Sequence, residues 1–301
     1  MGIPSDTRRL RATVLGTGAM APEIAAALHG AGAAVVIAGR SAERAAGALE
    51  RARALVGGGV GMSAAQIGPE AVRGAGLVVE TVVEDLAVKR DLLGRVADWC
   101  DAAALVATNT SSLRIGDIAD ALPNAGRVAG LHFLKPAHLT AVVEVIPGPA
   151  TDPATTAALG DLAARMGKTP LMVRGDVPGF IWNRIQFAVL RECLHMLEAG
   201  VADVADIDAA VSDGLAPRWM AAGPLASADM GGLRTFAAVA AGLFPALSDA
   251  RQVPDALSRR AAEDGTFASW TAGDGAGVAE LRARALEMGR EIGERRRGLH
   301  G

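Results

Sequence analysis

The sequence predicts an α/β fold in which a doubly wound sheet over residues 8–176 is followed by an all-helical domain over residues 177–301. Short β-branched runs alternate with Ala-rich helical stretches in the first half of the chain. A Gly-rich turn joins the first of these runs to the first helical stretch. Beyond residue 176 the strand signals stop, and helical patterns continue to the end of the chain.

The predicted strands are short runs of Val, Ile, Leu and Ala. They are almost continuously apolar, as is typical of strands that are buried on both faces. We therefore expect a parallel sheet with helices on both sides. The predicted strands are residues 11–15, 34–38, 77–81, 104–107, 127–131, 142–146 and 171–173.

The second domain is predicted from helical periodicity. Residues 185–198 place an apolar stripe that includes Ile185 on one face, and Gly200 follows as a stop signal. Asp206 is expected to cap the next short helix. Residues 277–297 form a charged helical pattern that either docks on a partner subunit or frays.

Composition excludes several classes of function. The aromatic content is 3%, there is no Tyr and the formal net charge is -3, so we expect no nucleic-acid partner. Cys100 and Cys193 are too few for a disulfide framework or a metal site. No apolar run that could act as a signal peptide follows the polar residues 1–11, so we expect none. The longest apolar run, residues 236–247, is too short to span a bilayer. We expect a cytoplasmic protein without a membrane partner.

The Gly-rich turn reads Gly16-Thr17-Gly18-Ala19-Met20-Ala21 and lies between the strand 11–15 and a helix over 22–28. Gly16 permits a tight turn, Gly18 lets a pyrophosphate approach the backbone, and the small Ala21 lets the helix pack closely on the strand. The free N–H groups of that helix then face the phosphates. By itself the pattern also fits an ordinary turn, but its position between strand and helix predicts a Rossmann-type dinucleotide site.

The end of the second strand carries Arg40 and Ser41 where NAD enzymes usually have an acidic residue. A guanidinium and a hydroxyl suit a 2′-phosphate, so NADP is favoured over NAD. The alternative is that Ser41 is only a helix N-cap and Arg40 is solvated.

Three segments carry polar groups that a core pattern does not require: residues 108–113, residues 131–136, and Glu144 within an apolar strand. The first two are expected to follow strands and to open onto the same crevice as the Gly-rich turn. A buried carboxylate needs a partner, and His132 is the natural one, which predicts a histidine general base oriented by an acid. A hydrogen-bonded core histidine with an edge-strand glutamate fits the spacing equally well.

Several motifs together resemble the 3-hydroxyacyl-CoA dehydrogenase family over about residues 10–245. This resemblance implies a helical second domain that forms a homodimer. The motifs are the Gly-rich turn, Glu80-Thr-Val-Val-Glu84 with Lys89, Asn109-Thr-Ser-Ser112, Gly130-Leu-His-Phe133 with Pro136, and Pro178-Gly-Phe-Ile-Trp-Asn-Arg184.

The resemblance implies a role for each matching residue. His132 matches the family's general base, and Glu144 matches the acid that orients it. Ser111 matches a serine near the substrate hydroxyl, and Asn183 matches an asparagine that helps to fix the substrate.

Glu84 and Lys89 match residues that line the cofactor on its nicotinamide side, although their spacing alone also fits a surface ion pair.

The chain also departs from the family pattern. Lys135 replaces the usual Asn, where it could meet a carboxylate or phosphate of the substrate, or be solvated or contact the cofactor. The segment between Arg40 and Leu77 is shorter than the helical hairpin that helps to clamp coenzyme A in typical members of the family. The family's Lys-Thr-Gly-x-Gly-Phe ending is replaced by Thr266-Phe-Ala-Ser-Trp270.

The second domain carries Asn183-Arg-Ile-Gln-Phe187 and Gly214-Leu-Ala-Pro-Arg-Trp-Met-Ala-Ala-Gly-Pro224. In these segments it resembles relatives that oxidise free small 3-hydroxy acids, such as L-gulonate and carnitine dehydrogenases, and lambda-crystallins. Arg218 there could bind a carboxylate as a bidentate fork, or it could be structural.

We expect hydride transfer between a nicotinamide and the 3-hydroxyl or 3-oxo carbon of a thioester carried by coenzyme A or an acyl carrier protein. The alternatives are a free small 3-hydroxy acid as substrate, or a cofactor-binding structural protein without turnover.

Overall fold

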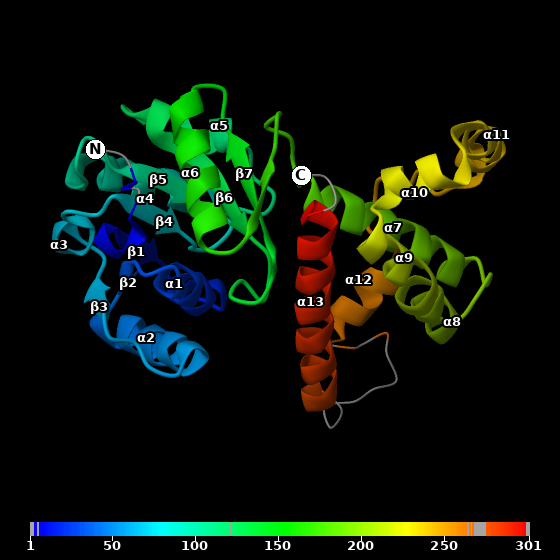
Figure 1. Ribbon diagram of the computed structural model, residues 1–301, viewed down its shortest axis with the longest axis horizontal. Coiled ribbons are helices and arrows are strands. Elements are labelled where there is room, and N and C mark those ends of the chain that lie inside the picture. Colours follow the sequence, from blue (N-terminus) through cyan, green and yellow to red (C-terminus); the bar gives the residue numbers. More distant parts are fainter. Residues whose placement is uncertain are drawn as a thin grey trace. The chain divides into compact units, whose positions relative to one another are not determined.

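The protein is described by a computed structural model that covers residues 3–4, 6–120, 122–263, 265, 267 and 275–298. It consists of two compact units, Met1–Arg184 and Ile185–Gly301, which are treated separately below (Figure 1). Segment 177–184 belongs to the first unit, whereas the sequence predicts a boundary after Asp176. Phe180 explains this, because its side chain is buried with Ile115, Ile146 and Val173.

An eight-stranded sheet forms the centre of the first unit, in the order β3-β2-β1-β4-β5-β6-β7-β8. The predicted doubly wound fold is confirmed, and β1 has the predicted bounds. The strands are β1 (Arg11–Leu15), β2 (Ala34–Gly39), β3 (Met62–Gln66), β4 (Leu77–Glu80), β5 (Leu105–Thr108), β6 (Val128–Phe133), β7 (Val142–Pro147) and β8 (Thr169–Met172).

The sheet differs from the prediction in two respects. Strand β3 was not expected, because its sequence Met-Ser-Ala-Ala-Gln contains no β-branched residue and it pairs only with β2. Strands β6 and β7 run antiparallel, so the expectation of a parallel sheet is wrong at this pair. Only residues 134–141 connect them, which is too short for the crossover that a parallel pair requires.

Two apolar clusters cover the two faces of the sheet. Consecutive strand residues alternate between them, so that Val14 belongs to one cluster and Leu15 to the other. Helices α1 (Met20–Gly30), α2 (Ala42–Val56) and α6 (Pro153–Arg165) pack on one face (Figure 1). Helices α3 (Pro69–Val72), α4 (Leu86–Trp99) and α5 (Ile115–Ala119) pack on the other. Short 3₁₀ turns lie at Thr7–Arg9 and Ala125–Arg127.

The second unit is helical, as predicted. It contains α7 (Trp182–Glu198, which begins in the first unit), α8 (Val204–Ala209), a π-helical turn η3 (Ala210–Leu215), α9 (Ala216–Ala221), α10 (Pro224–Gly231), α11 (Leu233–Leu243), the 3₁₀ turn η4 (Phe244–Ala246), α12 (Asp255–Ala262) and α13 (Gly275–Gly298). The Arg296 guanidinium of α13 donates to the Met220 carbonyl of α9, so this helix contacts its own unit.

Two local predictions for this unit need correction. The buried residue of α7 is Leu194, whereas Ile185 of the predicted stripe is 51% exposed. Asp203, not Asp206, caps α8, because its carboxylate accepts from the Asp206 amide at 2.9 Å. Gly200 does end α7, with a left-handed φ of 66°.

The segment 266–270 stands where the family has its Lys-Thr-Gly-x-Gly-Phe ending. Of this segment, Thr266 and residues 268–270 lie outside the described residues. No helix within the described part of the chain is both long and apolar enough to cross a bilayer.

Candidate active site

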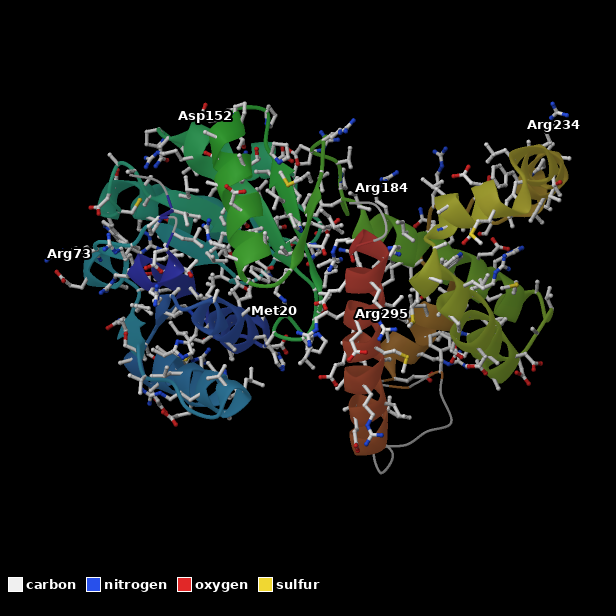
Figure 2. All side chains as sticks on the ribbon, viewed as in Figure 1. Met20, Arg73, Asp152, Arg184, Arg234 and Arg295 are labelled. Carbon is white, nitrogen blue, oxygen red and sulfur yellow. The ribbon has the colours of Figure 1, made fainter. Side chains whose placement is uncertain are left out.

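The Gly-rich turn has the backbone that a dinucleotide site requires. Gly16 follows β1 with a φ of 136°, and a Cβ there would lie 2.3 Å from the Thr81 carbonyl oxygen. A Cβ on Gly18 would meet no atom within 4 Å, so this position is open to a ligand. Met20, labelled in Figure 2, begins α1, and no side chain caps the N-terminus of that helix. Its first N–H groups are therefore available to an anion.

A cavity of about 810 Å³ adjoins this turn within the first unit. Its volume falls within the range of small-molecule and cofactor sites. The residues that line it are Gly16, Thr17, Gly18, Ala19, Met20, Gly39, Arg40, Arg44, Gln66, Ile67, Thr81, Val82, Val83, Val88, Asp91, Leu92 and Arg95. Ala21 lies behind the turn and is fully buried, as close helix packing requires.

The cationic end of this cavity differs from the prediction in one residue. Arg40 lines the cavity, but Ser41 does not. The Ser41 hydroxyl accepts from the Arg44 amide at 3.3 Å and caps α2. Arg44, which the sequence prediction left out of the site, lines the cavity beside Arg40. Its position in the first turn of α2, the helix that begins just after Arg40, is the signal that could have identified it.

His132 and Glu144 face one another across the antiparallel pair β6–β7. The imidazole Nδ1 lies 2.6 Å from Glu144 Oε2, and both side chains are buried. His132 lies inside β6 rather than after it, contrary to the prediction. The alternative of an edge-strand glutamate is also wrong, because β8 pairs with the outer side of β7.

The second oxygen of Glu144 binds the start of α7. Glu144 Oε1 accepts from the backbone amides of Ile181 and Trp182 at 2.8 and 2.9 Å. Left-handed backbone at Gly179 and Phe180, with φ of 79° and 50°, turns successive N–H groups toward the carboxylate. Burial alone would raise the pKa of Glu144, but the hydrogen bonds from His132, Trp182 and Ile181 outweigh burial and hold it below its ordinary value.

Phe180 is a site residue that sequence reasoning missed. Its ring lies 5.7 Å from the His132 ring between centroids, at an interplanar angle of 60°. A non-glycine residue with positive φ carries local strain, which is common beside functional groups. The Pro-Gly-Phe sequence of residues 178–180 was the available signal.

Ser111 and Asn183 complete one connected set of side chains with His132 and Glu144. Ser111 Oγ lies 3.1 Å from His132 Nε2. The Asn183 side-chain amide donates to the Ser111 carbonyl at 3.0 Å. All four predicted catalytic residues are therefore brought together. None of the four is among the residues that line the cavity beside the Gly-rich turn, although the sequence predicts that the segments of Ser111 and His132 open onto the same crevice as that turn.

Lys89 lies inside the protein rather than at the surface. Its side chain is 1% exposed, and its Nζ lies 2.8 Å from Glu80 Oε1 and 3.3 Å from Glu84 Oε2. Glu80, which was not predicted as a site residue, also accepts from the Thr108 hydroxyl at 2.7 Å. A carboxylate at the end of the apolar run Leu-Val-Val-Glu was the same signal that identified Glu144.

The two predicted substrate cations lie in different units. Lys135 is exposed on the loop between β6 and β7. Arg218 is exposed on α9 of the second unit. Among the described residues, no group of three or more His, Cys, Asp and Glu side chains could hold a metal ion.

The doubly wound sheet and the open Gly-rich turn at a helix N-terminus are the features of a dinucleotide-binding fold. The buried His–Glu pair is suited to proton transfer. The model of the 3-hydroxyacyl-CoA dehydrogenase NAD-binding domain matches residues 11–177, and that of the C-terminal domain matches residues 179–276. The chain belongs to the 3-hydroxyacyl-CoA dehydrogenase family.

The chain is 34% identical to a 5-formyl-3-hydroxy-2-methylpyridine 4-carboxylate 5-dehydrogenase of Mesorhizobium japonicum, over 78% of this chain and 80% of that protein. A crystal structure of an enzyme of that name, described as an NAD+ dependent dismutase, has a TM-score of 0.84 and 29% identity, and the match covers 95% of this chain and 97% of that one. The mitochondrial hydroxyacyl-coenzyme A dehydrogenase of Homo sapiens is 41% identical, over 48% of this chain and only 45% of its own length.

Proposed function

We propose that this chain moves a hydride between a nicotinamide cofactor and the carbon that bears a 3-hydroxyl or 3-oxo group, with His132 as general base. One observation carries the proposal. His132 Nδ1 is held by Glu144 at 2.6 Å, and His132 Nε2 lies 3.1 Å from the Ser111 hydroxyl. The Nε2 atom is therefore the one that can exchange a proton with a substrate hydroxyl.

Each neighbouring residue has a distinct part in this proposal. Glu144 accepts from Nδ1–H, which fixes one tautomer and stabilises the imidazolium that forms as Nε2 takes the proton. Ser111 donates to the substrate oxygen, and Asn183 holds the Ser111 carbonyl and helps to fix the substrate. The nicotinamide, when bound, accepts or supplies the hydride.

The open Gly18, the uncapped N-terminus of α1 and the adjoining cavity fit a dinucleotide. Within that site we propose a preference for NADP over NAD. Arg40 and Arg44 both line the cavity, and a 2′-phosphate would meet two guanidinium groups there. We assign Ser41 no part in this preference, because it does not line the cavity and its hydroxyl oxygen caps α2.

The first candidate substrate is a 3-hydroxyacyl thioester carried by coenzyme A or by an acyl carrier protein. The family to which the chain belongs supports this candidate. A thioester would place the chain in fatty acid metabolism.

The second candidate is a free small 3-hydroxy acid. In place of a helical hairpin, the single helix α2 leads directly into β3, which leaves fewer contacts for a coenzyme A moiety. The similarity to the Mesorhizobium protein, named for a pyridine carboxylate, extends over most of both chains. Lys135 and Arg218 are both exposed, and we propose each of them as a candidate partner for a substrate carboxylate.

The test follows absorbance of the reduced cofactor with acetoacetyl thioesters of coenzyme A and of an acyl carrier protein, and with free 3-hydroxy acids. Turnover of thioesters alone would support the first candidate, and turnover of free acids alone the second. The His132→Ala variant should lose turnover in either case, whereas His195→Ala, an exposed histidine of α7, should not. No turnover of any substrate by a cofactor-loaded wild type would favour a structural protein.

A further inference from the structure

We propose that Glu84 is a positioning residue, whose carboxylate fixes the loop after β5 and thereby aims the Ser111 hydroxyl at His132. The proposal rests on the proposed function, because it assumes that hydride transfer takes place beside His132. It differs from the cofactor-lining role that the family resemblance implies for Glu84.

One oxygen of Glu84 accepts hydrogen bonds from three consecutive loop residues, 110–112. Glu84 Oε1 accepts from the backbone amides of Ser111 and Ser112 at 2.9 and 3.0 Å. It also accepts from the hydroxyl groups of Thr110 at 2.5 Å and Ser112 at 3.1 Å. The loop is therefore tied to one atom through both its backbone and its side chains.

The other oxygen of Glu84 forms an ion pair with the buried ammonium group of Lys89. Glu84 Oε2 lies 3.3 Å from Lys89 Nζ, and Lys89 is 1% exposed. Lys89 cannot turn away, because both Glu80 oxygens accept from its Nζ at 2.8 and 3.0 Å. Glu80 is fully buried and is itself satisfied by the Thr108 hydroxyl and the Val82 amide.

The charge state of Glu84 suits this task. Burial raises the pKa of Glu84, but the Thr110 hydroxyl, the Lys89 charge and the amides of Ser111 and Ser112 together hold it below its ordinary value. An ionised carboxylate accepts stronger hydrogen bonds from N–H and O–H groups than a neutral acid does.

Two further contacts hold the same loop at other points. Asn109 Oδ1 accepts from the Phe133 amide at 2.8 Å, and Asn183 donates to the Ser111 carbonyl. Glu84 is the contact that holds the amide of Ser111 itself. Without Glu84 the Ser111 carbonyl is still held by Asn183, but the Ser111 amide is not, so we expect the Ser111 hydroxyl to shift relative to His132 Nε2. A misplacement of about 1 Å can cost on the order of a hundredfold in rate.

The experiment uses Glu84→Gln, which preserves the size of the side chain but presents an amide nitrogen to Lys89 or to the loop donors. We expect kcat to fall about ten- to hundredfold. The dissociation constant of the reduced cofactor should change less than about twofold. Hydrogen exchange of residues 109–113 should become faster. Glu70→Gln, which breaks an exposed ion pair with Arg73, is the matched control and should leave all three quantities unchanged.

A weaker cofactor affinity with unchanged kcat and unchanged exchange would overturn the proposal and restore the cofactor-lining role. Adding Glu84→Gln to Ser111→Ala should cost little beyond Ser111→Ala, because both act through one hydroxyl, and a multiplicative loss would also overturn it. Hydrogen exchange needs no turnover, so it tests the loop contact even where His132→Ala retains activity and the proposed function fails.

Discussion

At the residue scale, the buried carboxylate of Glu144 links His132 to the backbone at the start of α7. One oxygen holds His132, and the other holds the Ile181 and Trp182 amides. Removing one partner of such a buried network leaves polar groups unsatisfied, which costs more than the net value of the contact.

We predict that His132→Ala lowers kcat by about two to four orders of magnitude, because general base catalysis typically contributes that much. The dissociation constant of the cofactor should stay unchanged. Glu144→Gln should also lower kcat, but adding it to His132→Ala should cost little more, since the two residues act as a unit. Steady-state kinetics with a cofactor titration checks this, and independent losses in the double variant would contradict it.

Glu144 also predicts a dependence of stability on pH. Because its pKa in the folded protein lies below the ordinary value of 4.5, its contribution to stability is complete above that value. The contribution is lost as the pH falls through the lower folded pKa. Urea unfolding from neutral pH into the acid range should show a steeper loss of unfolding free energy for the wild type than for Glu144→Gln. Equal slopes would mean that Glu144 ionises alike in both states.

Arg40 carries the cofactor prediction. A charge-assisted hydrogen bond to the 2′-phosphate is worth about 1.5–3 kcal/mol, equivalent to about ten- to hundredfold in affinity. Because Arg40 is exposed, solvent should reduce this to the lower end and salt should reduce it further. NADP should therefore bind more tightly than NAD to the wild type, and Arg40→Asp should reverse the order. Tighter NAD binding by the wild type would refute the preference.

At the element scale, the N-terminus of helix α2 assigns different roles to neighbouring residues: Ser41 caps the helix, whereas Arg40 and Arg44 line the cavity. The Ser41 hydroxyl caps this helix, so Ser41→Ala should lower the free energy of unfolding by about 1 kcal/mol. The ratio of NADP to NAD affinity should stay the same, because Ser41 does not line the cavity. Thermal unfolding and cofactor titrations check both parts, and a changed ratio with unchanged stability would return Ser41 to the cofactor site.

The prediction of individual elements succeeded where the pattern was strong. Strand β1 and the helix after it were predicted from an apolar run that leads into the Gly-rich turn. Strand β3 was missed because it is stabilised by pairing with β2 rather than by β-branched residues of its own. The antiparallel direction of β7 could have been predicted, since residues 134–141 are too few for a crossover.

At the scale of the whole molecule, we predict a homodimer formed through the second unit. Helices α10 and α11 and the turn η4 expose large apolar side chains, of which Leu225 is 84% and Phe244 69% exposed. Arg234, which is labelled in Figure 2, lies on α11 and locates this segment in the picture. In light scattering after size exclusion, Leu225→Asp should shift the wild-type dimer toward monomer. Val60→Asp, at a 97% exposed position in the first unit, is the control. A monomeric wild type would refute the prediction.

The sequence by itself determined the family and the order of most strands and helices, and its local patterns offered His132 and Glu144 as a candidate pair. Apolar runs, turn glycines and polar residues in apolar strands are visible without knowledge of contacts. Ser111 and Asn183, in contrast, were predicted as site residues only through the family resemblance. Only the tertiary structure decided which charges are buried together. By their spacing alone Glu84 and Lys89 fit a surface ion pair, until the fold placed Lys89 in the interior beside the fully buried Glu80. Burial and pairing depend on strands and loops that are distant in the sequence, so no local pattern specifies them.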